Sequence, residues 1–311
     1  MQLQKKITNR INNWLDNTLD IYGNRLLIQM RKNGQLLFLS ELIPCFRNTK
    51  LFVFGTGGSI ANLKNVERLK NYNLLMTTTG PYHCFRKYGF VPNFWTLTYA
   101  PIIDQILEQE KTQPLDFSDT FILIPTNDSI CKININTPSV KELINKHPEA
   151  TYVLYRCILH SKQWPVIVPP TYLMKDIEPI HGLYSNVLDN LFLPICFYLD
   201  VSTVYFSGID LIPTTGHFWD RSLHYQTMEG KPLEFPESKL IKKCADIVIQ
   251  ICQQKGKKIF RLENSETLLQ YYPFINFELS LNEATTIITP DYVKTQILQS
   301  YFGDTNNAAR N

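Results

Sequence analysis

Glycine and charge are both scarce in this 311-residue chain, which has only 13 glycines and 19% charged residues. No stretch of 18 apolar residues occurs, so the sequence predicts no membrane-spanning helix. The net charge is only +3 and no block of lysine and arginine stands out, which argues against a nucleic-acid partner. With 44% hydrophobic and 12% aromatic residues, the composition is that of a globular protein with a large core.

The seven cysteines are scattered, odd in number and never spaced as a CxxC pair. This pattern disfavours structural zinc and disulfides and favours reduced, buried thiols. The first residues lack the apolar run of a secretory signal peptide, so we expect a cytoplasmic protein. Apolar residues up to position 21 follow helical spacing with basic residues among them. We expect this helix to pack on its own domain; the alternative is peripheral contact with the inner face of the cytoplasmic membrane.

From residue 50 onward, short apolar runs alternate with helical stretches, which predicts an α/β fold. The expected architecture is a Rossmann-like, mostly parallel sheet with helices on both faces. Strands are expected near 35–42 and at 51–55, 73–79, 93–99, 120–125, 151–156, 203–211 and 258–263. Helices are expected at 60–72, 81–90, 102–111, 181–200 and 236–256.

Three regions follow from this reading. Residues 1–48 are expected to form an N-terminal helical extension, and residues 49–290 a single Rossmann-like domain. The stretch 161–178 carries three prolines and is expected to be an irregular insertion over the sheet edge. Residues 291–311 are expected to form a C-terminal helix and tail.

The stretch "LFVFGTGGSI", residues 51–60, places three of the few glycines within four positions after an apolar strand. A strand that runs into such a turn, followed by a helix, can direct backbone N–H groups at a phosphate. The spacing is neither GxGxxG nor the GxxxxGK[ST] of a P-loop. The alternative is a tight strand-to-helix connection that needs glycine for its backbone alone.

Further turns fall at the ends of predicted strands, at residues 55–59, 77–80, 98–101 and 208–210. In an open parallel sheet, ligands bind at the carboxyl ends of the strands. We therefore expect these four turns to share one edge of the sheet.

Three segments resemble a known superfamily. "FGTGGSI" looks like the G-x-G-P-S-L opening shared by the sialyltransferases of glycosyltransferase family 42, the motility accessory factors and the hydroxymethylpterin pyrophosphokinases. "HGLYSNVLDNLFL" followed by "VYFSGID" resembles the sialyltransferase segment that ends in S-G-I-D. "YGFVPNFWTLT" resembles the G-I-x-P-D turn of the pyrophosphokinases. The resemblance covers roughly residues 50 to 265, and its most specific parts are the glycine turn and "FSGID".

The resemblance implies a bacterial glycosyltransferase in polysaccharide or lipopolysaccharide synthesis. Its donor would be a CMP-activated sugar, sialic-acid-like or Kdo-like, and its acceptor a cell-surface glycan. Such transfer is a direct displacement that needs neither metal nor cofactor. Pyrophosphoryl transfer from ATP instead needs carboxylates for a divalent metal. Asn93 stands where that group has Asp, and the next carboxylate is Asp104, so we favour the sialyltransferase-like branch.

Carried over to this chain, the resemblance gives a set of donor-binding candidates from the turns and the start of the helix at 181–200. They are Gly55, Thr56, Gly57, Gly58, Ser59, Thr79, Thr98, His181, Gly182, Gly208 and Asp210. His181 stands where the family has Ser or Thr and has helix capping as its alternative role. For Asp210 the alternative is to hold its own loop through backbone N–H groups.

Catalysis would need a general base for the acceptor hydroxyl. The loop "GIDLIPTTGHFWDRSLHY" offers His217, Asp220 and His224, and we expect His217 or His224 to be the base. The family's own histidine, just before the next helix, is missing here, and Glu237 is the nearest substitute. Phe218 and Trp219 either stack on the acceptor sugar or fill the core.

Two other functions stay open: a pyrophosphokinase-like enzyme of the same fold, and an inactive glycan-binding homologue. The sequence also leaves open the donor sugar, the acceptor, the linkage and the oligomeric state, including a homo-oligomer.

Overall fold

The structure is a computed structural model that describes residues 25–77, 79–98, 100–125, 133–155, 187–210, 216–220, 238–263 and 270–308. Within these ranges, eight strands form one sheet in which every neighbouring pair is parallel. The strands are β1 (Leu36–Phe38), β2 (Lys50–Phe54), β3 (Leu74–Thr77), β4 (Phe94–Thr96), β5 (Phe121–Pro125), β6 (Thr151–Tyr155), β7 (Thr203–Ser207) and β8 (Lys258–Arg261). The expected α/β, Rossmann-like fold is confirmed.

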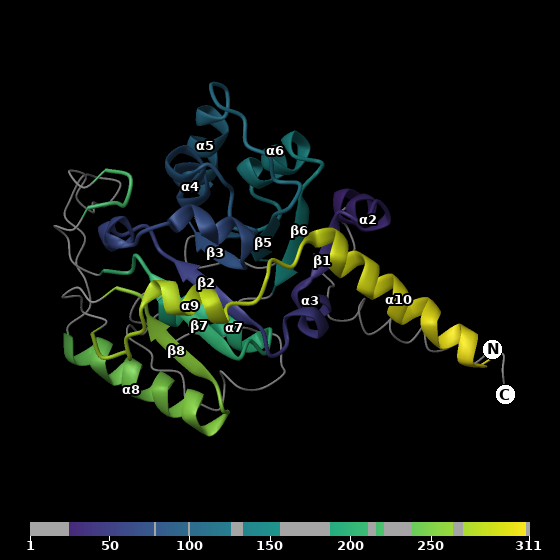
Figure 1. Ribbon diagram of the computed structural model, residues 1–311. Helices are drawn as coiled ribbons and strands as arrows, with labels where there is room; N and C mark the ends of the chain where they lie inside the picture. The colour runs from purple at the N-terminus through teal and green to yellow at the C-terminus, as the bar shows by residue number, and fades with distance from the viewer. Residues whose placement is uncertain are drawn as a thin grey trace.

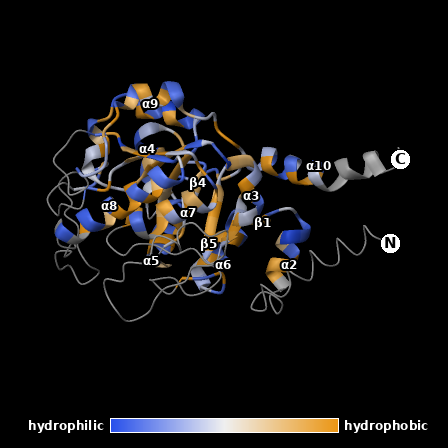
Figure 2. Cartoon of the chain, turned by 90° about the horizontal axis from the view of Figure 1, so that it is seen from below, coloured by the Kyte–Doolittle hydropathy of each residue, from blue (hydrophilic) through white to orange (hydrophobic). Residues whose placement is uncertain are grey.

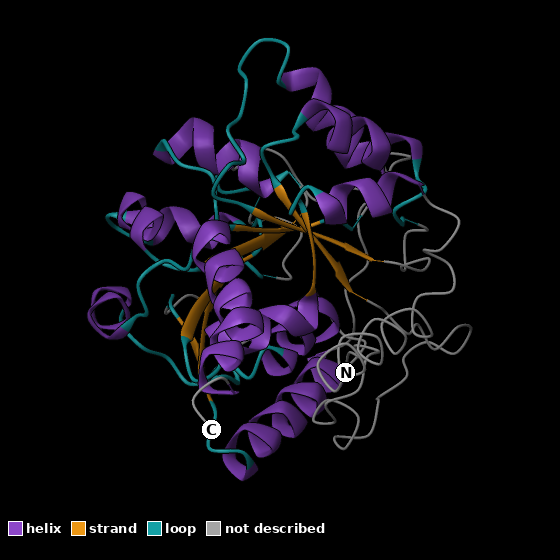
Figure 3. Cartoon of the chain, turned by 90° about the vertical axis from the view of Figure 1, so that its right-hand side faces the viewer, coloured by secondary structure: helices purple, strands orange, loops and turns teal. Residues whose placement is uncertain are grey.

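Helices cover both faces of the sheet (Figure 1 and Figure 3). The α-helices are α2 (Arg25–Lys32), α3 (Leu39–Phe46), α4 (Gly80–Tyr88), α5 (Ala100–Gln109), α6 (Pro138–Lys146), α7 (Leu193–Tyr198), α8 (Ser238–Gln254), α9 (Phe277–Glu283) and α10 (Pro290–Ala308). Two 3-10 helices, η1 (Gly58–Asn62) and η2 (Val66–Asn71), follow β2, and a π-helical turn, η4 (Leu188–Phe192), precedes α7.

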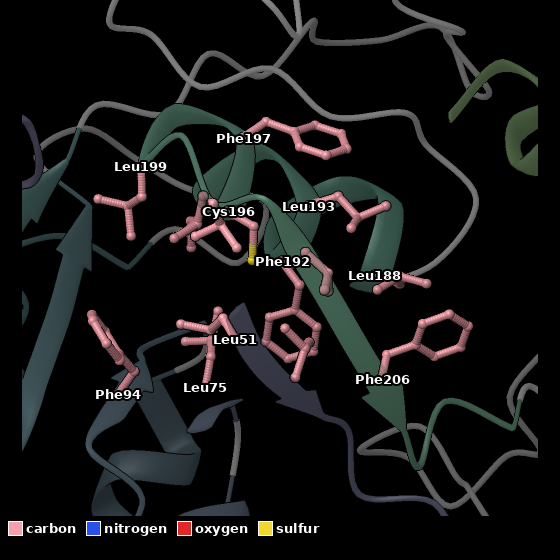
Figure 4. Close-up of a cluster of buried hydrophobic side chains, with 14 of the residues drawn as sticks. Leu51, Leu75, Phe94, Leu188, Phe192, Leu193, Cys196, Phe197, Leu199 and Phe206 are labelled. Atoms are coloured by element: carbon pink, nitrogen blue, oxygen red, sulfur yellow. The ribbon is translucent and has the colours of Figure 1, made fainter. Parts of the chain in front are cut away.

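The strands read as continuous apolar runs because both of their faces are buried. On β2, Leu51 and Val53 face a cluster with α3, α7 and α8, whereas Phe52 and Phe54 face η1, η2 and α9. Figure 4 shows the first cluster, in which side chains of η4 and α7 lie over Leu51 and Leu75 of the sheet. In Figure 2 hydrophobic residues colour much of the sheet, whereas the helices mix hydrophobic and hydrophilic residues.

The helix expected at 60–72 is wrong in kind, because two 3-10 helices occupy this stretch. Asn65 lies between them with a left-handed backbone, φ 59°, which an α-helix does not allow and which Asn tolerates better than most residues. The helix expected at 181–200 is described only from residue 187. There the N–H of Leu193 donates to the carbonyl of Leu188, one residue further back than in an α-helix. Pro194, which has no N–H, follows directly.

Part of the expected N-terminal extension belongs to the main sheet. The strand expected near 35–42 is confirmed only over β1 (Leu36–Phe38), because α3 begins at Leu39. β1 pairs with β6 as the edge strand. At the other end of the chain, α10 projects beyond the body of the molecule (Figure 1). Residues 1–24 and the expected insertion at 161–178 lie outside the described ranges. No helix within those ranges has the length and apolar character needed to span a bilayer.

The strand order places a topological switch point between β2 and β7. It reads β1-β6-β5-β4-β3-β2-β7-β8, so successive strands first extend to one side of β2 and the chain then returns to add β7 on the other. Ligands of open α/β sheets bind beyond the carboxyl ends of the strands at such a point. Here those ends carry the glycine turn after β2 and the "SGID" turn after β7.

Candidate functional site

The glycine turn and the turn after β7 are joined directly. The N–H of Gly55 donates to the carbonyl of Ser207 at 2.9 Å, and the N–H of Gly57 donates to the carbonyl of Gly208 at 2.7 Å. A Cβ at Gly55 would overlap the Gly208 carbonyl oxygen and lie 2.9 Å from Cγ1 of Ile209. Close approach of the two turns therefore requires glycine at position 55.

The same close approach accounts for the next glycines. A Cβ at Gly57 would lie 2.6 Å from a carboxylate oxygen of Asp210. Gly208 has φ +70°, and a Cβ there would lie 2.5 Å from Cδ1 of Ile60. The two turns form one compact unit that tolerates no side chain at these positions.

Buried hydrogen bonds of Ser59 and Asp210 hold the two turns together. The N–H of Ser59 donates to Oδ2 of Asp210 at 3.0 Å, and the Ser59 hydroxyl donates to Oδ1. The N–H of Gly208 donates to the Ser59 hydroxyl oxygen at 3.2 Å. Both side chains are buried. Asp210 thus has a structural role, as the sequence allowed, but it joins its turn to the glycine turn through the backbone N–H and the hydroxyl of Ser59.

These bonds limit how the glycine turn can bind phosphate. The N–H groups of Gly55, Gly57 and Ser59 already donate to protein acceptors, and Gly58 begins η1. Thr56 is the half-buried tip of the turn. In this conformation, Thr56 is the residue of the turn best placed to meet a donor.

Glu263 is a site residue that the sequence reasoning missed. It follows β8, and its Oε1 lies 3.1 Å from the Ser59 hydroxyl oxygen, so it joins Ser59 and Asp210. Burial raises the pKa of Glu263 to about 7; the Asp210 charge adds to this, and the Ser207 and Ser59 hydroxyls oppose it. Its place after the strand "KIFRLE", matching that of Asp210 after "VYFSGID", is the signal that could have found it.

The predicted catalytic loop packs on the glycine turn over residues 216–220. The N–H of Phe218 donates to the carbonyl of Thr56 at 3.1 Å, and His217 forms an antiparallel bridge with Gly57. Phe218 is buried in the core, which is one of its two expected roles. Asp220 is exposed, and its backbone pairs with that of His217 at 3.0 and 3.2 Å.

A hydrogen bond and a ring stack hold the His217 ring in place. Its Nδ1 lies 3.4 Å from the carbonyl of Thr56, and its ring stacks on Trp219 with centroids 4.4 Å apart. Burial lowers the pKa of His217, while the Thr56 carbonyl and the Asp220 charge raise it. A neutral imidazole that donates from Nδ1 to Thr56 carries its lone pair on Nε2, the tautomer that a general base needs.

Trp219 stacks on a second histidine, His83 of α4, with centroids 3.7 Å apart and nearly parallel planes. Burial lowers the pKa of His83 to about 4, and Arg86 and His217 add to this effect. Lys87 of α4 also donates to the carbonyl of Phe218. Trp219 is thus packed against protein rings, and it ties the loop of His217 to α4.

Two of the three predicted threonines, Thr79 and Thr98, follow the neighbouring strands β3 and β4. The hydroxyls of Thr77 and Thr98 are 3.2 Å apart, which joins the ends of β3 and β4. Thr79 is buried immediately before α4, whose N-terminus lies at the carboxyl edge of the sheet. The four predicted turns therefore end adjacent strands, in the order β4-β3-β2-β7. The candidates His181, Gly182, His224 and Glu237 lie outside the described residues.

Asn93 lies at the opposite edge of the sheet from these turns. It precedes β4, its Oδ1 accepts from the N–H of Leu74 at 2.7 Å, and its Nδ2 donates to Oδ1 of Asn73 at 3.0 Å. The missing carboxylate at position 93 therefore says nothing about a metal at the carboxyl edge. Among the described residues, no three His, Cys, Asp or Glu side chains gather as a metal site requires; metal independence stays a prediction.

No protein-family model and no curated protein sequence matches the chain. Among solved structures, it is similar to the sialyltransferase CstII from Campylobacter jejuni in complex with a substrate analogue, cytidine-5′-monophosphate. The identity is 12% and the TM-score 0.40, with 73% of this chain and 85% of that chain covered. It is also similar to the Maf glycosyltransferase from Magnetospirillum magneticum AMB-1, at 12% identity and a TM-score of 0.44, with 86% and 42% covered. Both neighbours are glycosyltransferases. At 12% identity and TM-scores below 0.5, these similarities concern the fold alone. The function therefore has to be inferred from the residues of this chain.

Proposed function

We propose that this chain is a glycosyltransferase that moves a sugar from a CMP-linked donor, sialic-acid-like or Kdo-like, to a cell-surface glycan without a metal ion. One observation carries the proposal. The glycine turn and the "FSGID" turn, the most specific parts of the family resemblance, meet at the topological switch point of the sheet. The loop with His217 lies directly on them.

The donor phosphate would bind at the tip of the glycine turn. Thr56 supplies a hydroxyl there, and the N-terminus of α4, next to Thr79, adds a favourable dipole for an anion. Asp210 and Ser59 act from beneath by holding the turn in shape.

His217 would act as the general base. Its Nε2 takes the proton of the acceptor hydroxyl, whose oxygen attacks the anomeric carbon as the bond from that carbon to the phosphate oxygen breaks and CMP leaves. The Thr56 carbonyl and the Trp219 ring fix the imidazole, and burial keeps it neutral near pH 7.

Thermal denaturation of the purified protein with CMP, UDP, GDP and ATP, each with and without magnesium, tests the proposal. A ligand present at a hundredfold its Kd stabilises by about 2.7 kcal/mol, which is easily measured. We expect a metal-independent shift with CMP alone, and turnover of a CMP-sugar in an acceptor screen. A shift with ATP and magnesium alone would favour a pyrophosphokinase. CMP binding without turnover on any acceptor would favour the inactive homologue.

A further inference from the structure

Two buried carboxyl groups share one hydroxyl at the carboxyl edge of the sheet. Asp210, Glu263 and Ser59 are 2%, 6% and 5% exposed, and they come from the turn after β7, the residues after β8 and η1. Ser59 contacts Oδ1 of Asp210 on one side and Oε1 of Glu263, at 3.1 Å, on the other. The cluster therefore joins three chain segments beneath the glycine turn.

The hydrogen bonds of this cluster favour a proton on Glu263. A hydroxyl has one hydrogen to donate and two lone pairs with which to accept. Ser59 gives its hydrogen to Asp210, its nearer partner, and accepts the N–H of Gly208 at 3.2 Å. Only a lone pair of the Ser59 oxygen is left to face Glu263. If Glu263 were ionised, its Oε1 would also present a lone pair, and the two oxygens would repel each other. A protonated Glu263 instead donates to Ser59 and completes the set.

The surroundings of Glu263 favour the protonated acid as well. Burial, the largest effect, and the Asp210 charge raise the pKa of Glu263 to about 7 and outweigh the Ser207 and Ser59 hydroxyls, which lower it. Oε2 makes no hydrogen bond among the described residues. Arg261 lies on β8, just before Glu263. Its Nη1 donates to the main-chain carbonyl of Glu263 at 2.7 Å, and its Nε donates to the main-chain carbonyl of Tyr272 at 3.0 Å. Ionisation would place a second negative charge beside Asp210, in a buried setting where it is poorly screened.

We propose that Glu263 is a positioning residue: its protonated carboxyl group completes the Ser59–Asp210 lock that joins the glycine turn to the end of β7. Ionisation of Glu263 breaks the lock and weakens nucleotide binding at the turn. The lock is a property of the folded chain alone, whereas its effect on binding rests on the proposed function.

The first test needs no nucleotide. A carboxyl group whose pKa is about 7 in the folded protein and 4.5 unfolded contributes stability that is full below pH 4.5 and is lost as the pH rises through 7. Glu263→Gln keeps the shape and a donor but cannot ionise. Between pH 5 and 7.5 we expect the Tm of the wild type to fall by about 4 °C relative to Glu263→Gln. Glu142→Gln, on the exposed surface of α6, should run parallel to the wild type.

The second test is calorimetric titration with CMP at pH 6, 7 and 8. Titration of the CMP phosphate affects both proteins equally, so the difference between them isolates Glu263. We expect the wild type to lose about tenfold more affinity than Glu263→Gln over this range, as one linked proton requires. If Glu263→Gln does not fold, ¹³C titration of the glutamate carboxyl groups of the wild type should show one midpoint near pH 7.

The outcomes separate the two claims. Parallel unfolding profiles, or the absence of a glutamate midpoint near pH 7, would overturn the lock. Divergent unfolding profiles with parallel CMP affinities would overturn the positioning role. If neither protein binds CMP at any pH, the proposed donor site is wrong and the positioning role falls with it, while the unfolding profiles still decide the protonation of Glu263.

Discussion

At the scale of single residues, Gly55 is fixed by contact with a neighbouring turn. Ala at position 55 would push its Cβ into the Gly208 carbonyl, which the β7 turn cannot withdraw without breaking the hydrogen bond to Gly57. We expect Gly55→Ala to destabilise by about 3 kcal/mol, measured by urea unfolding. Gly34→Ala is the matched control, because Gly34 has φ +69° but open space around it, and should cost about 1 kcal/mol. Equal losses would mean that the clash is relieved by movement.

His217 carries the chemistry of the proposed function. His217→Gln should lower the rate of sugar transfer by about 10²- to 10⁴-fold, the usual worth of a general base, and leave the Kd for CMP within a few-fold. Single-turnover rates and CMP titration measure the two effects separately. His83→Gln removes the other imidazole stacked on Trp219 and is the matched control, expected to retain most of the rate. Equal losses in both variants would show that His217 only supports the loop.

The residues found from sequence share a local signal, and the missed ones lack it. The glycine turn and Asp210 stand out because glycine clusters and polar residues that end apolar strands mark a binding edge. Glu263 satisfies the same rule but carries no glycine beside it. The His83–Trp219 stack joins residues 136 positions apart, and no spacing rule predicts such a pair.

At the scale of elements, two buried asparagines anchor the segment before α10. Asn73 Oδ1 accepts the N–H of Ile288 at 2.9 Å, and Asn93 Nδ2 donates to the carbonyl of Ile288 at 3.3 Å. Asn93→Asp turns this donor into an acceptor facing two oxygens, so we expect a loss of about 1 to 3 kcal/mol in unfolding free energy. Because Asn93 lies at the amino edge of the sheet, CMP affinity and magnesium response should stay unchanged. A gain of magnesium-dependent ATP binding would contradict this placement.

The strands were predictable because burial on both faces leaves an apolar run that few other elements produce. The stretch 60–72 has helical periodicity, yet the left-handed Asn65 and the fixed start of η1 at the glycine turn prevent an α-helix. Its apolar residues Ile60, Val66 and Leu69 still face the core. Periodicity thus gave the buried side of this stretch but not the kind of helix.

At the scale of the whole molecule, a second buried group that carries a proton lies before β6, at the amino edge of the sheet. His147, at the end of α6, places Nε2 3.0 Å from Glu110 and Nδ1 2.8 Å from Glu149, and Lys146 also binds Glu110 at 2.9 Å. Burial opposes the charged ring, but hydrogen bonds to the two carboxylates outweigh it and raise the pKa of His147. Both ring nitrogens donate, so the folded protein holds the imidazolium.

His147 and Glu263 therefore make stability fall with pH in neighbouring windows. A raised histidine pKa contributes stability that is full below the unfolded value of 6.5 and is lost as the pH rises through the folded value. The contribution of Glu263 is already lost by about pH 7. His147→Gln should cost about 1 to 3 kcal/mol at pH 6 and progressively less above pH 7, as measured by chemical unfolding from pH 5 to 9. Glu263→Gln should remove the fall in unfolding free energy below pH 7 and leave the fall above pH 7 unchanged. A His147→Gln penalty that stays constant from pH 6 to 9 would show that the ring is neutral in the folded protein.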